Sequence, residues 1–170
     1  MKKDQLLKKL EGAWAEIQES YTGLSDAQLM EPGVMGEWPV KDILGHVTMW
    51  EEEALKYLPL ILNGGRPPRY IQFGGIDAFN AQMTEQKRDT ALSDVLGQLD
   101  ETHRRLIEYL QSVPEEHFTG ETRFRRRLRL DTYSHYPLHA RAIREWREWL
   151  AIFRRKSGSR PEMHNTTHRV

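Results

Sequence analysis

Residues 39–62, PVKDILGHVTMWEEEALKYLPLIL, contain the pattern that decides the fold. Apolar side chains recur there every three or four positions, which is the period of one face of an α-helix. That face consists of Val40, Ile43, Val47, Trp50, Ala54 and Leu58. Pro39 suits the first helical position, where its missing N–H needs no partner, and Asn63-Gly64-Gly65 ends the helix. The stretch predicts a long amphipathic helix, with a kink at Pro59 in its last turn.

The same period predicts three more long helices, with Asp4 and Ser93 as the N-caps of the first two. They cover residues of about 4–22, 93–113 and 134–155. Four long helices and no convincing pair of strands favour an all-α fold, a four-helix bundle.

Two shorter segments connect these helices. Residues 76–89, which follow a loop rich in glycine and proline, predict an extra short helix in the crossover between the second and third long helices. Residues 117–130 show no helical period, and we expect an extended piece of chain there. The predicted domain covers residues 1–155, and residues 156–170 form a polar C-terminal tail.

Length and composition exclude several classes of protein. The chain has 170 residues, of which 38% are apolar, and these values suit one globular domain. Its longest apolar run, Tyr57–Leu62, is too short to span a membrane, and its charged start lacks a secretory signal. Without cysteine there is no disulfide, no thiolate nucleophile and no cysteine-type zinc site. We therefore expect a cytoplasmic protein with no membrane partner.

The charges balance overall but not along the chain. Residues 1–85 have 8 basic and 13 acidic side chains, whereas residues 86–170 have 17 and 12. The basic excess includes the cluster of Arg123, Arg125, Arg126, Arg127 and Arg129. Such a cluster is typical either of a nucleic-acid contact or of a solvated loop paired with an acidic helix. The neutral total favours the loop and disfavours nucleic acid as a partner.

Two histidine pairs have the i, i+4 spacing that places both rings on one helix face. His135 and His139 align with a predicted core face of Ala142, Ile143, Trp146, Leu150 and Phe153. His164 and His168 have the same spacing in the tail but no such face. The first pair is consistent either with half of a metal site or with hydrogen-bonded core histidines.

His46 favours the metal site. It lies three residues after Ile43 and four before Trp50, so it faces the interior, away from the charged side of Glu51 and Glu52. Three inward histidines on two helices of one bundle are a usual way to build a metal site, and three ligands leave a coordination position open. Glu53 is a weaker candidate, either as a base near the site or as a solvated carboxylate.

Three segments together resemble a known family. They are WPVKDILGHVTMWEEEAL at 38–55, IDAFNAQ at 76–82 and YSHYPLHARAIREW at 133–146. These segments are similar to the DinB-like (YfiT-type) metalloenzyme superfamily, and the HYPLHA form is similar to its ClbS/DfsB branch.

The resemblance implies an up-down-down-up bundle with zinc or nickel bound by His46, His135 and His139. It also implies activities such as thiol-dependent transfer or isomerisation, or, for the ClbS type, protection against a cyclopropane-containing genotoxin.

Pro137 lies between two of the proposed ligands. Either the last long helix begins near Ser134, or it kinks because Tyr133 loses its N–H partner. Both outcomes reorient His135 relative to an ideal helix.

Three functions remain open at this stage. The first is a metal-dependent hydrolase or thiol S-transferase that acts on a small electrophilic molecule, with a low-molecular-weight thiol as cosubstrate if thiol chemistry occurs. Tyr133, Tyr136 or an acidic neighbour would assist proton transfer. The second is a ClbS-like protective or nucleic-acid-associated binding protein. The third is a bundle with a vestigial metal site. Apolar helix faces also permit a homodimer.

Overall fold

The structure is a computed structural model that describes residues 1–157. The regular secondary structure of the described residues is helical, and their only β-type pairing is an isolated bridge between Met35 and Trp38. The helices are α1 (Lys3–Tyr21), α2 (Asp26–Leu29), α3 (Val40–Leu62), η1 (Tyr70–Phe73), α4 (Ile76–Lys87), α5 (Leu92–Ser112), η2 (Glu115–Phe118), α6 (Arg123–Asp131) and α7 (Tyr136–Ser157). The predicted all-α class is confirmed. Within residues 1–157, no helix is both long enough and apolar enough to cross a bilayer.

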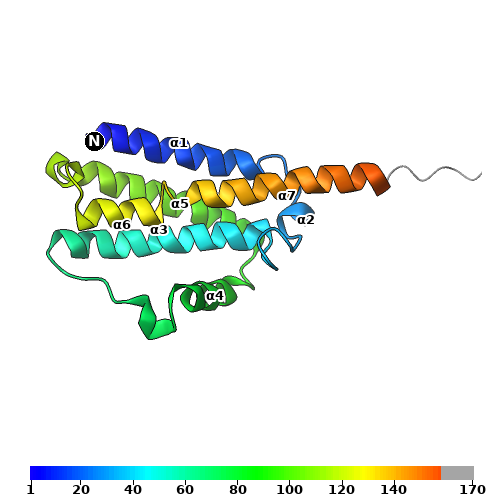
Figure 1. The fold of residues 1–170 in the computed structure, drawn as a ribbon, viewed down its shortest axis with the longest axis horizontal. Helices are drawn as coiled ribbons and strands as arrows, with labels where there is room; N and C mark the ends of the chain where they lie inside the picture. The colour runs from blue at the N-terminus through cyan, green and yellow to red at the C-terminus, as the bar shows by residue number, and fades with distance from the viewer. Residues whose placement is uncertain (158–170) are drawn as a thin grey trace, which may run out of the picture.

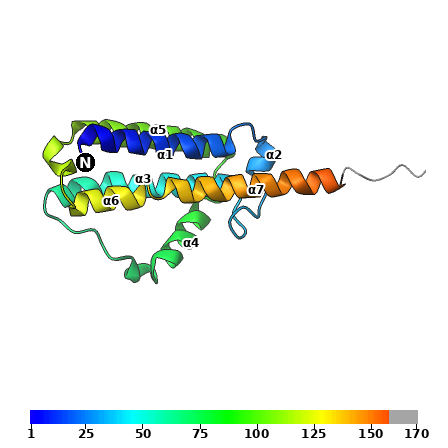
Figure 2. The same cartoon turned by 45° about the horizontal axis from the view of Figure 1, so that its top comes forward.

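The long helices lie side by side around one apolar core (Figure 1). α1 packs on α7, while α3 packs on both α5 and α6. α4, the predicted crossover helix, lies outside this bundle against α3 (Figure 2). The end of α7 extends past the end of α1 in the same view, and Trp149, Ile152 and Phe153 are exposed there. The expectation that Phe153 faces the core is therefore wrong.

Helix starts differ from the prediction by one or two residues. α1 begins at Lys3 after Lys2, so Asp4 lies in the first turn and is not the cap. α5 begins at Leu92 after Ala91, because Leu92 packs against the core and extends the helix before Ser93. Pro39 is the N-cap of α3 and not its first residue. Acidic side chains in a first turn still stabilise the helix dipole.

The expectation of extended chain at 117–130 is wrong, because residues 123–131 form α6. The Thr122 side chain caps this helix by accepting a hydrogen bond from the backbone N–H of Arg125. Phe124, Leu128 and Asp131 are buried at i, i+4 and i+7, which is a helical period. The period was not apparent from the apolar pattern because only two of the three buried residues are apolar, while Leu130, which is apolar, is exposed.

A buried polar network joins the long helices at the middle of the bundle. Glu51 is 0% exposed, which corrects its placement on a charged surface. Its Oε1 accepts a hydrogen bond from the Tyr136 hydroxyl and lies 2.7 Å from His103 Nδ1. The Trp14 ring stacks on His103 at 3.6 Å, so α1, α3, α5 and α7 all contribute. Burial raises the pKa of Glu51, and its two hydrogen bonds act in the opposite direction.

We predict that Glu51→Ala lowers the free energy of unfolding by about 3–5 kcal/mol, because it leaves His103 and Tyr136 buried without their partner. Glu52→Ala is the matched control. Glu52 is exposed and pairs with Lys87, so its loss should cost less than about 1 kcal/mol. Urea unfolding of both variants measures the difference, and equal losses would contradict a structural role for the network.

Candidate metal centre

His46, His135 and His139 converge in space, as their sequence pattern predicts. His135 Nε2 lies 3.1 Å from His46 Nε2 and 2.8 Å from His139 Nε2. One ring nitrogen from each residue lies within 4.8 Å of the others, and no other such group of His, Cys, Asp or Glu occurs in residues 1–157. Ligands about 2.05 Å from a tetrahedral zinc ion lie about 3.3 Å apart, close to the spacing observed.

A break between α6 and α7 places His135 at this point. Thr132 ends α6 with φ −131° and ψ −103°, and its carbonyl accepts from the backbone N–H groups of His135 and Tyr136. α7 begins at Tyr136, so Pro137 lies in the first turn, where its missing N–H costs nothing. His135 is thus outside the helix that carries His139. This matches the first of the two outcomes expected of Pro137, with a helix start two residues later than Ser134.

The three imidazoles are held neutral. Burial lowers the pKa of His46 to about 3, of His135 to about 2 and of His139 to about 4. Each neutral ring has one nitrogen lone pair, so His135 Nε2 cannot accept good hydrogen bonds from both neighbours. A cation between the three nitrogens would satisfy all three lone pairs. The donor set therefore fits a divalent metal such as zinc.

Residues around the centre pack against the three rings, and one of them contacts the outer nitrogen of His139. His139 Nδ1 lies 3.2 Å from Met35 Sδ, a contact that suits an N–H at Nδ1 and leaves Nε2 free as a ligand atom. The Trp38 ring lies 5.2 Å from the His46 ring, and the Trp50 ring lies 6.2 Å from that of His135. The loop before α3 thus covers the centre, a role that the sequence pattern did not indicate.

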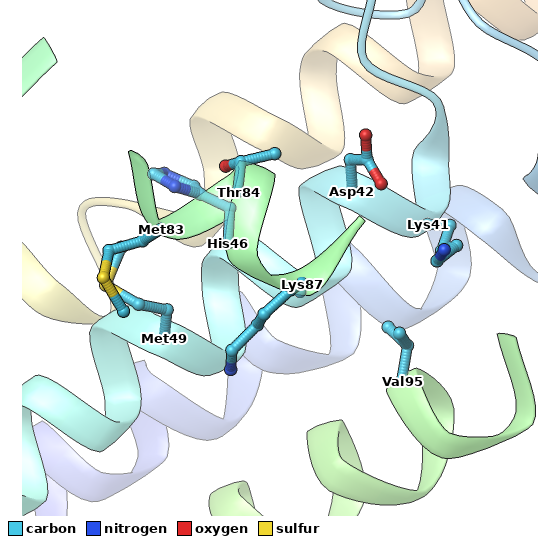
Figure 3. A pocket seen from close by; sticks show the side chains of 9 residues that line it. Lys41, Asp42, His46, Met49, Met83, Thr84, Lys87 and Val95 are labelled. Atoms are coloured by element: carbon cyan, nitrogen blue, oxygen red, sulfur yellow. The ribbon is translucent and has the colours of Figure 1, made fainter. Parts of the chain in front are cut away.

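α4 closes the centre on the His46 side. Figure 3 shows Met83 and Thr84 of α4 beside Met49 and His46 of α3. The cavity between these helices has a volume of about 10 Å³, which holds one water molecule at most. A larger molecule cannot reach the histidines from this side.

A larger cavity opens on the His135 side, with a volume of about 300 Å³. Its walls come from α3, η1, α4, α6 and the turn before α7. They consist of Trp50, Tyr70, Ile76, Asn80, Arg127, Leu130, Asp131 and His135. Apart from His135, none of these was predicted from the sequence to lie beside the histidines, although Arg127 belongs to the basic cluster considered for nucleic acid. The only sequence signals were Trp50 at i+4 from His46 and Asn80 in the IDAFNAQ segment.

Glu53 belongs to a charge cluster beside this cavity. Its Oε2 accepts a hydrogen bond from the Tyr70 hydroxyl at 3.0 Å and lies 3.7 Å from Arg127 Nη2. Arg127 also donates from Nε to Asp131 and from Nη2 to Tyr70. Burial raises the pKa of Asp131 to about 7, although Arg127 acts to lower it. Glu53 is thus not the solvated carboxylate expected, and no hydrogen bond joins it to the three histidines.

The other weak candidates lie elsewhere. Tyr136 is fully buried, and its hydroxyl donates to Glu51 in the central network. Tyr133 packs in the core with Lys9 over its ring. His164 and His168 lie outside the described residues.

The sequence matches the DinB superfamily over residues 9–142, more than half of the chain. The chain belongs to the DinB superfamily. No curated protein matches it.

Solved structures agree with this assignment at the level of the fold. The colibactin self-resistance protein ClbS, solved in complex with double-stranded DNA, has a TM-score of 0.70 at 15% identity. That match covers 85% of this chain and 94% of ClbS. DfsB, described as a sibling lethal factor precursor, has a TM-score of 0.71 at 15% identity over 88% of this chain and 97% of its own. An uncharacterised Escherichia coli UTI89 protein has a TM-score of 0.70 at 13% identity. That match covers 86% of this chain and 93% of the other protein.

We predict that the metal-free protein loses stability as the pH falls from 7.5 to 5.5. The unfolded histidines titrate near 6.5 and the folded ones at about 4 or below, so the unfolded chain binds more protons in this range. The histidines should account for a loss of roughly 1 kcal/mol each, while Asp131, whose pKa is raised to about 7 in the folded chain, binds a proton in the same range and offsets on the order of 2 kcal/mol of that loss. Urea unfolding across this range measures it. Asp131→Asn removes the opposing contribution, and a flat profile in that variant would show that the three rings are not held neutral. His117→Ala, at a more exposed histidine outside the centre, is the control.

Proposed function

We propose that this DinB superfamily member is a divalent-metal-dependent enzyme that acts on a small electrophilic molecule, either as a hydrolase or as a thiol S-transferase. The observation that carries the proposal is the convergence of three neutral imidazole nitrogens beside a cavity of about 300 Å³. His46, His135 and His139 would hold zinc or nickel. Such an ion lowers the pKa of a water or thiol that binds it and polarises an electrophilic group.

The protein itself would position the substrate beside the histidines and exclude water from the other sides of the centre. His135 lies on the cavity wall, so a substrate in the cavity is in contact with one of the three histidines. α4 and the loop before α3 close the remaining sides. Since the chain has no cysteine, a thiol reaction would need a low-molecular-weight thiol as cosubstrate.

We predict that the purified protein binds one zinc or nickel ion per chain, and that His46→Ala lowers the stoichiometry to near zero. His117→Ala is the matched control and should keep the metal. Elemental analysis after gel filtration measures the metal content. In the cobalt-substituted protein, a thiol titration that adds a sulfur-to-metal charge-transfer band favours the transferase, whereas a spectrum that responds only to pH favours the hydrolase.

Stoichiometric binding that survives His46→Ala would place the metal elsewhere and overturn the proposal. Metal binding without any effect of thiol or pH on the spectrum would favour the vestigial site.

We propose nucleic-acid binding as a second function, because α6 presents a basic face. Arg123, Arg126 and Arg129 are exposed at i, i+3 and i+6, and none of them forms an ion pair with another described residue. Arg123 Nη1 donates to the Gly65 carbonyl, so the 64–69 loop lies beside the helix. That loop adds the exposed Arg66 and Arg69. The ClbS complex with double-stranded DNA supports the same proposal, against the expectation drawn from net charge.

We predict that Arg126→Ala/Arg129→Ala weakens binding to a DNA duplex at least tenfold and lowers the salt dependence of log K by about two, one phosphate contact per arginine. Fluorescence anisotropy at several salt concentrations measures both quantities. Arg104→Ala/Arg141→Ala removes two exposed arginines that pair with glutamates elsewhere, and it should leave binding unchanged. Equal losses in the two double variants would mean non-specific attraction without a defined face.

A further inference from the structure

The cavity beside His135 has features that select a class of substrate, an inference that rests on the enzymatic function proposed above. Its volume of about 300 Å³ is at the lower limit of small-molecule sites. The Trp50 and Tyr70 rings form one part of the wall, and Ile76 and Leu130, both about half exposed, lie at its open side. Flat rings and aliphatic groups favour a flat, largely apolar molecule.

Arg127 does not make the cavity an anion site. Its charge is balanced by the Asp131 carboxyl, which accepts from its Nε, and by Glu53 Oε2 at 3.7 Å. Trp50, Tyr57 and Tyr70 surround the guanidinium, with ring centroids 5.3–5.8 Å from it. The set has no net positive charge, so the side chains of the cavity wall offer an anion no free counter-ion, and a metal ion bound by the three histidines would be the only one. Arg127 instead holds the aromatic wall in place.

Asn80 provides a neutral donor at the same wall. Trp50 Nε1 donates to Asn80 Oδ1 at 3.2 Å, and an indole N–H is only a donor, so this bond fixes which end of the amide faces Trp50. The Asn80 amino group is then left with no hydrogen-bond partner in residues 1–157, on a partly buried residue that lines the cavity, where water reaches it and a ligand can replace that water. A group that accepts a hydrogen bond would satisfy it.

We propose that Asn80 is a specificity-determining residue, and that the cavity takes an uncharged, flat, mostly apolar molecule whose carbonyl oxygen accepts a hydrogen bond from Asn80 Nδ2. Trp50, Asn80 and His135 line the same cavity, so such a molecule would reach both Asn80 and the metal centre from one position.

Three probes of similar size test the proposal in the metal-free protein, where no bound cation can attract a carboxylate: 2-acetylnaphthalene, the hydrocarbon 2-ethylnaphthalene and the anion 2-naphthoate. Their dissociation constants come from titrations followed at the Trp50 indole N–H in ¹H–¹⁵N NMR spectra, assigned with Trp50→Phe. The ketone should bind about tenfold more tightly than the hydrocarbon, as one hydrogen bond predicts, and the anion most weakly.

Asn80→Asp is the decisive variant, because it keeps an oxygen for Trp50 and removes the amino donor. It should weaken ketone binding about tenfold and leave hydrocarbon binding nearly unchanged. Gln82→Glu makes the same amide-to-acid change at an exposed position of α4 and should change nothing. Equal binding of ketone and hydrocarbon, tighter binding of the anion, no effect of Asn80→Asp, or no binding of any probe would each overturn the proposal.

The enzymatic function and the selectivity of the cavity can fail independently. The same probe titrations in the His46→Ala variant, together with the metal content, show which of the two fails. If the protein binds no metal, the enzymatic function fails, while a ketone preference that depends on Asn80 still supports the selectivity of the cavity. If metal binds but the preference is absent, only the selectivity fails.

Discussion

The cost of burying three imidazoles at one point is the constraint on which the rest of this structure depends. Each ring is removed from water, and burial lowers each pKa far enough that none is protonated at neutral pH. Two features bring the rings together in this structure: α3 and α7 are held at a fixed distance, and His135 lies in the turn before α7. The break at Thr132 accounts for the second feature. The packing of α3 and α7 on their neighbours accounts for the first.

A second buried polar cluster helps to fix that packing. Glu51 lies on the same helix as His46, and Tyr136 directly follows His135, so the central network involves the same two segments that carry the histidines. Displacement of α3 relative to α7 would break hydrogen bonds to a carboxylate with 0% exposure. Stability and the geometry of the centre are therefore coupled through the bundle, although the two clusters share no side chain.

The sequence predicted what periodicity and spacing can express. The long helices, the crossover helix and the histidine trio follow from side chains at fixed intervals along one helix face. Three features of the structure were not predicted in this way, each for a physical reason. α6 was missed because one of its three buried residues is the polar Asp131 and the apolar Leu130 is exposed, so the apolar pattern does not follow the buried face. Glu51 was placed on the surface because its two partners are 52 and 85 residues away. The Arg127, Tyr70 and Glu53 contacts join three separate segments, and no local pattern encodes such a meeting.

α6 connects the two proposed functions, because its opposite faces serve different purposes. Arg127 faces inward and holds the aromatic wall of the cavity, while Arg123, Arg126 and Arg129 face solvent. Leu130, next to the last of these, is exposed and lines the cavity as well. A nucleic acid that lay along the basic face would thus lie close to the cavity's open side. The cavity would then face the bound polymer, and a small electrophile near the nucleic acid could enter it without crossing the bundle, so the two functions are compatible in one molecule.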